Sequence, residues 1–72
     1  MIRRQLVNGL SENQKGMLLF IVNEGHSFFI DLDTVCSYKL PALQQRLEAG
    51  KARVKEENLN EYEHLCAIVG AG

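Results

Sequence analysis

The sequence predicts a mostly α-helical domain with a small β component, that is, an α+β fold, in one domain over residues 1–72. Cap and stop residues bracket three stretches in which apolar side chains recur at helical spacing, and two shorter stretches alternate as strands do. Hydrophobic residues make up 46% of the chain, a fraction typical of a folded globular protein. The predicted helices span 11–24, 41–49 and 58–69, and the predicted strands span 27–32 and 51–55.

The first predicted helix begins at a capping box in residues 11–14, which read Ser-Glu-Asn-Gln. The Ser11 hydroxyl can accept a hydrogen bond from the Gln14 amide while the Gln14 side chain reaches back to the Ser11 amide. The helix is expected to run to Glu24, because Gly25 is suited to the left-handed conformation that ends helices.

Six consecutive apolar residues, 17–22, occupy the middle of this helix. At about 100° per residue, six such side chains surround the helix and have to be covered on every side. A chain of 72 residues has little with which to cover them. The segment is therefore expected to be the centre of the core, or to be covered in part by a second copy or by a partner protein.

In residues 27–32 the side chains are expected to face the core and away from it in turn, as in a half-buried strand. The side chains expected to face the core are Phe28, Ile30 and Leu32. Phe29 and Asp31 then lie on the other face, where Phe29 is exposed unless another surface covers it. A short helical turn is expected over residues 35–38, capped by Asp33 or Thr34.

The second predicted helix starts with Pro41 in its first turn, carries Leu43 and Leu47 on its core stripe and stops at Gly50. Residues 51–55 then alternate basic and apolar side chains, as a short edge strand would.

Asn58 and Glu61 repeat the capping pattern before the last helix. Its core stripe consists of Leu59, Tyr62, Leu65, Cys66 and Val69. At the two ends of the chain, residues 1–10 are expected to form an arm or a short strand, and residues 70–72 are expected to fray.

Charge and cysteine content limit the class of protein. Eight Lys or Arg against nine Asp or Glu give a net charge of −1, which removes the simplest argument for nucleic-acid binding. Cys36 and Cys66 are too few for a disulfide framework and are expected to be reduced thiols. The chain carries neither a signal-peptide core nor an apolar run of the ~20 residues that span a bilayer, so a cytoplasmic protein is expected.

Residues 28–35, Phe-Phe-Ile-Asp-Leu-Asp-Thr-Val, resemble the first motif of the haloacid dehalogenase-like phosphotransferases. The resemblance implies Asp31 as the nucleophile, Asp33 as the acid and base, and a bound magnesium ion. It covers eight residues, and the 37 residues that follow are too few for the parallel sheet on which that family builds its site. We therefore expect Asp33 to cap a helix and Asp31 to be a solvated strand residue.

No metal, cofactor or catalytic site is expected, and the protein is not expected to be an enzyme. His26, Cys36, His64 and Cys66 lack the closely spaced pairs that structural zinc sites use. The six glycines are too scattered for a phosphate-binding loop and are expected at turns and helix stops.

The favoured function is a protein-interaction or regulatory module that binds a larger protein or forms a homodimer. A single core below about 70–80 residues seldom supplies more than roughly 3–5 kcal/mol, so association is a common source of further stability. Apolar residues also exceed what one small core can hide. The candidate interface residues are Met17, Phe20, Phe29 and Ile68.

The alternative is a DNA-binding regulator, because the order of elements loosely resembles a helix-turn-helix or winged-helix domain. Gln and Arg side chains make bidentate contacts to bases, and a basic segment would bind phosphates. The candidate contacts are Gln45, Arg46, Lys51, Arg53 and Lys55. The acidic residues Glu48, Glu56 and Glu57 lie beside them in sequence and cancel much of their field.

Overall fold

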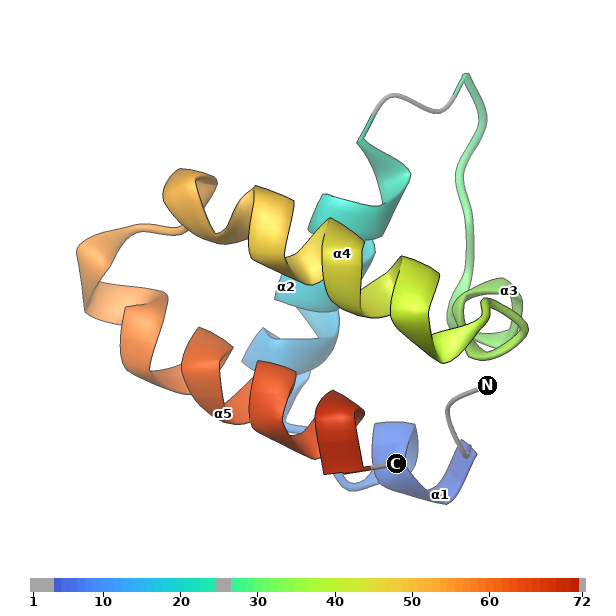
Figure 1. The fold of residues 1–72 in the computed structure, drawn as a ribbon, viewed down its shortest axis with the longest axis horizontal. Coiled ribbons are helices and arrows are strands. Elements are labelled where there is room, and N and C mark those ends of the chain that lie inside the picture. Colours follow the sequence, from blue (N-terminus) through green and yellow to red (C-terminus); the bar gives the residue numbers. More distant parts are fainter. Residues whose placement is uncertain (1–3, 25–26, 72) are drawn as a thin grey trace.

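The computed structural model describes residues 4–24 and 27–71 and gives an all-α fold (Figure 1). Of the described residues 79% are helical, and none of them belongs to a strand. The predicted α+β class is therefore wrong. The helices, in chain order, are α1 (Arg4–Asn8), α2 (Glu12–Asn23), α3 (Leu32–Cys36), α4 (Leu40–Gly50), η1 (Lys51–Arg53), η2 (Glu56–Asn58) and α5 (Leu59–Ala71).

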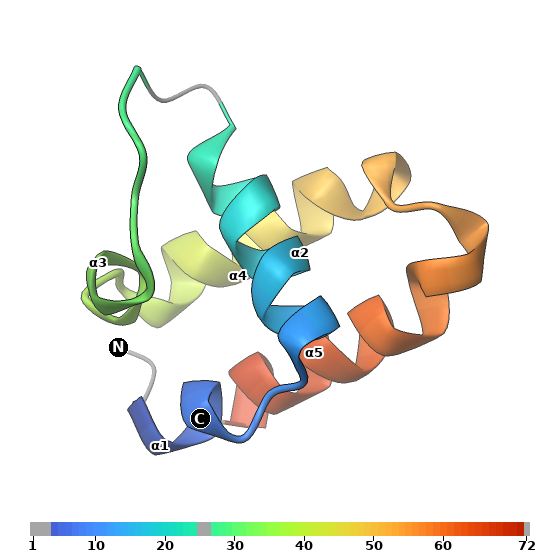
Figure 2. The ribbon, with the colours of Figure 1, turned by 180° about the vertical axis from the view of Figure 1, so that it is seen from behind.

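Three main helices, α2, α4 and α5, surround the core. Helix α2 crosses behind α4 and α5 in Figure 1 and in front of them in Figure 2, which shows the opposite side. The short helices α1 and α3 contact each other at one end of the molecule. Among the described residues, no helix has the length and apolar character needed to cross a membrane. The buried apolar side chains are Val7, Leu10, Leu18, Ile21, Val22, Ile30, Val35, Leu43, Leu47, Tyr62, Leu65 and Val69.

The capping box of the first predicted helix is confirmed. The Gln14 amide donates to the Ser11 hydroxyl (3.1 Å), and the Ser11 amide donates to the Gln14 side chain (3.0 Å). The Gln14 side chain also donates to the Glu61 carbonyl (3.3 Å), which ties the start of α2 to α5. The C-cap is Glu24, and the stop predicted at Gly25 lies outside the described residues.

The strand predicted over 27–32 is wrong, because the Asn23 side chain takes the place of a neighbouring strand. Its Oδ1 accepts from the Ile30 amide, while its Nδ2 donates to the carbonyls of Ile30 (3.0 Å) and Leu19 (2.8 Å). One amide side chain satisfies both peptide groups of Ile30, so no ladder is needed there. Ile30 is buried as predicted, but Phe28 is 69% exposed and does not face the core.

The helix after this segment begins earlier than predicted, because Asp31 is its cap and neither Asp33 nor Thr34 is. The Asp31 carboxylate accepts from the Thr34 amide (2.9 Å) and from the Thr34 hydroxyl (2.8 Å). Helix α3 accordingly spans Leu32–Cys36 and buries Val35.

The edge strand predicted over 51–55 is also wrong, because Gly50 does not stop the preceding helix. Gly50 has helical dihedral angles (φ −82°, ψ −10°) and is buried, and the chain continues from it into the 3-10 helix η1. A Cβ on Gly50 would lie 2.6 Å from Cγ2 of Ile21, so glycine allows α4 to approach α2 closely at this point. Glycine at this position therefore allows close helix packing and does not form a turn.

The two remaining predicted helices are confirmed. Pro41 occupies the first turn of α4, and Leu43 and Leu47 are buried. In α5 the predicted stripe buries Tyr62, Leu65 and Val69, with Leu59 and Cys66 half-buried.

The Tyr62 hydroxyl links α5 to the end of α4. It donates to the Leu47 carbonyl (2.6 Å), whereas the Lys51 amide donates to the next carbonyl, that of Glu48. Burial raises the pKa of the Tyr62 phenol, so the hydroxyl keeps the proton it donates.

The two ends of the chain are helical where they are described. Residues Arg4–Asn8, expected as an arm or short strand, form α1 and bury Val7. At the other end α5 continues to Ala71, so Gly70 and Ala71 belong to the helix.

Candidate functional site

The outer face of α2 is the most exposed apolar part of this helix. Within the six-residue apolar segment, Leu18, Ile21 and Val22 are buried, whereas the Phe20 side chain is 66% exposed. Met17 and Leu19 are half-buried at the margins of the core. The segment is thus not covered on every side within one copy of the domain.

A shallow groove runs along this outer face. It consists of two adjoining hollows of about 370 and 540 Å³ that share Gly16, Phe20 and Arg53. The first hollow lies between the first half of α2 and the segment that carries Val54 and Lys55. The second extends along α2 to its end and to Phe29. We call this surface the α2 groove.

Two phenylalanines converge on the α2 groove although they are nine positions apart. Phe20 comes from α2, and Phe29 comes from the irregular segment that Asn23 holds through Ile30. Phe29 is 73% exposed, the largest exposure among the large apolar side chains described. Phe28 is similarly exposed but is not among the residues that line the groove.

The structure brings together three of the four candidate interface residues. Met17 and Phe20 line the first hollow, and Phe20 and Phe29 line the second. Ile68 is half-buried on α5, where it packs against the core, and is not among the groove residues.

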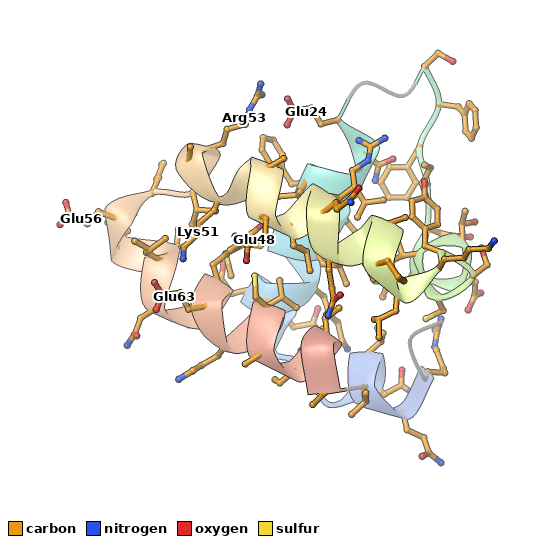
Figure 3. The ribbon with its side chains drawn as sticks, in the orientation of Figure 1. Glu24, Glu48, Lys51, Arg53, Glu56 and Glu63 are labelled. Carbon is orange, nitrogen blue, oxygen red and sulfur yellow. The ribbon has the colours of Figure 1, made fainter. Side chains whose placement is uncertain are left out.

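Charged side chains form the rim of the α2 groove. Arg53 makes an ion pair with Glu24, and Figure 3 shows these two side chains facing each other at one edge of the molecule. Arg46 donates to the backbone carbonyl of Glu24 (3.1 Å) and so fixes the end of α2 further. At the other end of the groove, Lys55 and Glu12 both line the first hollow.

The five candidate nucleic-acid contacts are distributed differently. Arg46 and Arg53 both bind Glu24, while Lys51 faces Glu63 of α5 across 3.6 Å. Figure 3 shows Lys51 and Glu63 pointing toward each other. Gln45 and Lys55 are exposed, Gln45 on α4 and Lys55 beside the groove. The basic side chains are therefore interspersed with acidic ones.

Both carboxylates of the phosphotransferase-like motif have structural contacts. Hydrogen bonds from the Thr34 amide and hydroxyl lower the pKa of Asp31, which caps α3. Asp33 makes an ion pair with Arg4 and so joins α3 to α1. Across residues 4–24 and 27–71, no three His, Cys, Asp or Glu side chains lie close enough together to hold a metal ion.

The cysteines and histidines considered as metal ligands lie in several elements. Cys36 ends α3 and Cys66 lies in α5, both as half-buried free thiols. Burial raises the pKa of the Cys66 thiol, and the nearby Glu48 carboxylate raises it further. His64 is exposed on α5, whereas His26 lies outside the described residues.

Two residues of the α2 groove were not predicted to line it from the sequence. Gly16 was expected at a turn, yet it lies within α2 and contributes to both hollows. Its position four residues before Phe20 places both on one helix face, so this spacing could have identified it. Arg53 was considered only as a contact to nucleic acid, and no local sequence pattern pairs it with Glu24.

The fold and the groove define the class of protein: a small all-α domain whose three main helices share one core and leave a groove along α2. The sequence matches no protein-family model, and the searches of curated proteins and of solved structures found no similar chain.

Proposed function

We propose that this protein is a small interaction module that binds another protein surface through the α2 groove. The single observation that supports this function is the convergence of two exposed aromatic rings, Phe20 and Phe29, on one groove. Aromatic side chains are enriched in the buried centres of interfaces because they bury a large area with few rotatable bonds.

The organisation of the groove also favours recognition over chemistry. Its walls combine the two rings with Met17, Leu19 and Val54, while the charged groups lie at its rim. An apolar centre within a polar rim is the usual arrangement of a protein interface. A catalytic site needs convergent polar groups, whereas Arg53 and Glu12 of this groove are paired with Glu24 and Lys15.

The DNA-binding alternative has weaker support. Phosphate binding requires Lys and Arg side chains that can neutralise phosphates, yet Arg53 and Lys51 already face carboxylates of their own chain. If DNA binding occurs, it should weaken steeply with salt and be lost on combining Arg46→Ala with Arg53→Ala. Retention on duplex DNA at about 50 mM salt tests this alternative.

Affinity capture from the native cell, with and without nuclease treatment, tests the proposed function. Phe29→Ala and Phe20→Ala should each weaken capture by roughly 1–3 kcal/mol, while Phe28→Ala, at a similarly exposed position outside the groove, should leave capture unchanged. Circular dichroism should show unaltered helicity in all three variants. Equal effects of the three substitutions, or no effect of any, would contradict a role for the α2 groove.

A further inference from the structure

We propose that the α2 groove binds a second copy of this chain, with the two α2 helices antiparallel across a two-fold axis and Phe20 of each copy seated over the partner's Gly16. This inference rests on the proposed function and specifies which surface occupies the groove.

The first argument is shape. Gly16 and Phe20 are one helical turn apart, about 6 Å along the axis, on the same face of α2. Within the described part of the chain, a Cβ on Gly16 would meet no neighbouring atom within 4 Å beyond the helix's own backbone. The surface therefore carries an open space beside a projecting ring that is 66% exposed.

A two-fold axis would place the Phe20 ring of each copy in the space beside Gly16 of the other. In a two-fold interface, if residue i contacts residue j, then j contacts i. With antiparallel helices centred between positions 16 and 20, each Phe20 ring meets the partner's Gly16, and both open spaces are filled. Parallel helices would instead place Phe20 against the partner's Phe20 and leave the space above Gly16 empty. The antiparallel arrangement alone matches the ring to the space.

The charges at the two ends of the groove also favour antiparallel pairing. Lys55 lies at the groove end that holds Glu12 and Asn58, whereas Glu24 lies at the end that holds Phe29. Antiparallel pairing places the opposite ends of two grooves together, so Lys55 approaches the partner's Glu24. Glu24 would then contact both its own Arg53 and the partner's Lys55. Each end carries both signs of charge, Lys55 with Glu12 and Glu24 with Arg53, so antiparallel pairing brings Lys55 to the partner's Glu24, whereas parallel pairing brings each charge to its own copy.

The third argument is area. A phenylalanine side chain buries about 150–250 Å² when fully covered, so Phe20 and Phe29 together present roughly 300 Å² per copy. Two copies contribute about 600 Å², while a specific interface needs about 1,000 Å² in total. The exposed parts of Gly16, Met17, Leu19 and Val54 lie in the same groove and add to that area. The two rings thus supply about 60% of the area of a specific interface, so the expected homodimer is one of modest affinity.

Sedimentation velocity with light scattering tests this proposal. The wild-type protein should have a mass near twice 8.1 kDa at micromolar concentration and dissociate on dilution. Gly16→Leu fills the open space and Phe20→Ala removes the ring, so each should weaken dimerisation by at least about tenfold. Phe28→Ala, at an equally exposed position, should not. A monomeric wild type, or a dimer that tolerates Gly16→Leu, would overturn the proposal.

A reciprocal exchange provides a second test. Combining Gly16→Phe with Phe20→Ala moves the ring and the space by one turn and should restore the dimer that each single variant loses. Continued loss in the double variant, with helicity retained, would count against the proposed pairing. If the wild type is monomeric but Phe20→Ala still abolishes capture of another protein, the groove binds that protein and only the proposed dimer is wrong. If Phe20→Ala changes neither dimerisation nor capture, the proposed function is wrong too.

Discussion

The inner and outer faces of α2 carry similar side chains in different surroundings. Leu18, Ile21 and Val22 on the inner face are buried against other helices, while Phe20 on the outer face is 66% exposed. All four belong to one continuous apolar segment, so hydrophobicity alone does not separate them. What separates them is that α4 and α5 pack against one side of the helix. In a chain this short, an exposed apolar face is available for association.

Two helical glycines show the same difference between the open outer face and the packed inner face of α2. Gly16 on the outer face adjoins open space, whereas Gly50 of α4 is pressed against the inner-face residue Ile21. The first glycine leaves room for a molecule outside the domain, and the second allows two helices of the domain to approach. The predictions below test this contrast between the two faces, from the largest expected effect to the smallest.

Leu18→Ala should destabilise the protein by roughly 2–5 kcal/mol, because it leaves a cavity in a fully buried position. Phe20→Ala, two residues away on the outer face, should change the stability of the monomer by no more than about 0.5 kcal/mol. Urea denaturation followed by circular dichroism measures the stability of both variants at submicromolar concentration, where the monomer dominates. Similar losses in the two variants would show that the faces do not differ.

Gly50→Ala should destabilise the protein by roughly 1–3 kcal/mol, because the added Cβ would lie 2.6 Å from Cγ2 and 2.7 Å from Cδ1 of Ile21. Gly16→Ala should instead stabilise the monomer by roughly 0.5–1 kcal/mol, since alanine favours the helix and meets open space. Thermal and urea denaturation of both variants measure the change in the free energy of unfolding, which should have opposite signs in the two variants. Combining Gly50→Ala with Ile21→Ala should cost less than the sum of the two single changes.

Tyr62→Phe should cost about 1–2 kcal/mol, because it leaves the Leu47 carbonyl at the end of α4 without its buried hydroxyl donor. The ring remains, so packing against the core is preserved. Equilibrium denaturation of Tyr62→Phe beside the wild type measures the loss. Equal stability of the two proteins would mean that the hydrogen bond to Leu47 does not contribute to stability.

Asp31→Asn should produce the smallest effect, and one that depends on pH. The pKa of Asp31 is lowered in the folded state by its bonds to Thr34. Its stabilisation is therefore present above the ordinary value of 3.8 and is lost as the pH falls through the lower folded pKa. Asparagine still caps helices but does not titrate. The denaturation midpoints of the two proteins should converge as the pH falls below 3.8 and through the lower folded pKa of Asp31, whereas a constant difference would contradict the role of the charge.

Local patterns predicted the main helices well. The capping box at Ser11, Pro41 in a first turn and the stripe around Tyr62 depend on residues within about a turn of one another, and the structure confirms all three. The predicted strands failed because their outcome depended on distant groups. Asn23 binds both peptide groups of Ile30, and Gly50 is a helical residue that lets α4 approach Ile21 of α2 closely.

Only some residues of the candidate site could be predicted, because the others also depend on groups that are distant in sequence. Met17 and Phe20 were identified because a small core cannot hide the apolar segment, and Phe29 because a strand, which the structure does not have, would turn it away from the core; all three line the α2 groove. Gly16 and Arg53 were not assigned to it, since their roles depend on which face of α2 remains open. Ile68 was assigned on hydrophobicity alone and lies elsewhere.

The sequence by itself determined three helices, the capping box at Ser11 and an excess of apolar side chains, because these properties depend on neighbours a few positions away. Only the tertiary structure decided which side of α2 is buried, where Asn23 and Gly50 act, and that Phe20 and Phe29 lie on one surface. Burial depends on how helices distant in sequence pack, and an apolar side chain has the same identity whether or not a helix covers it.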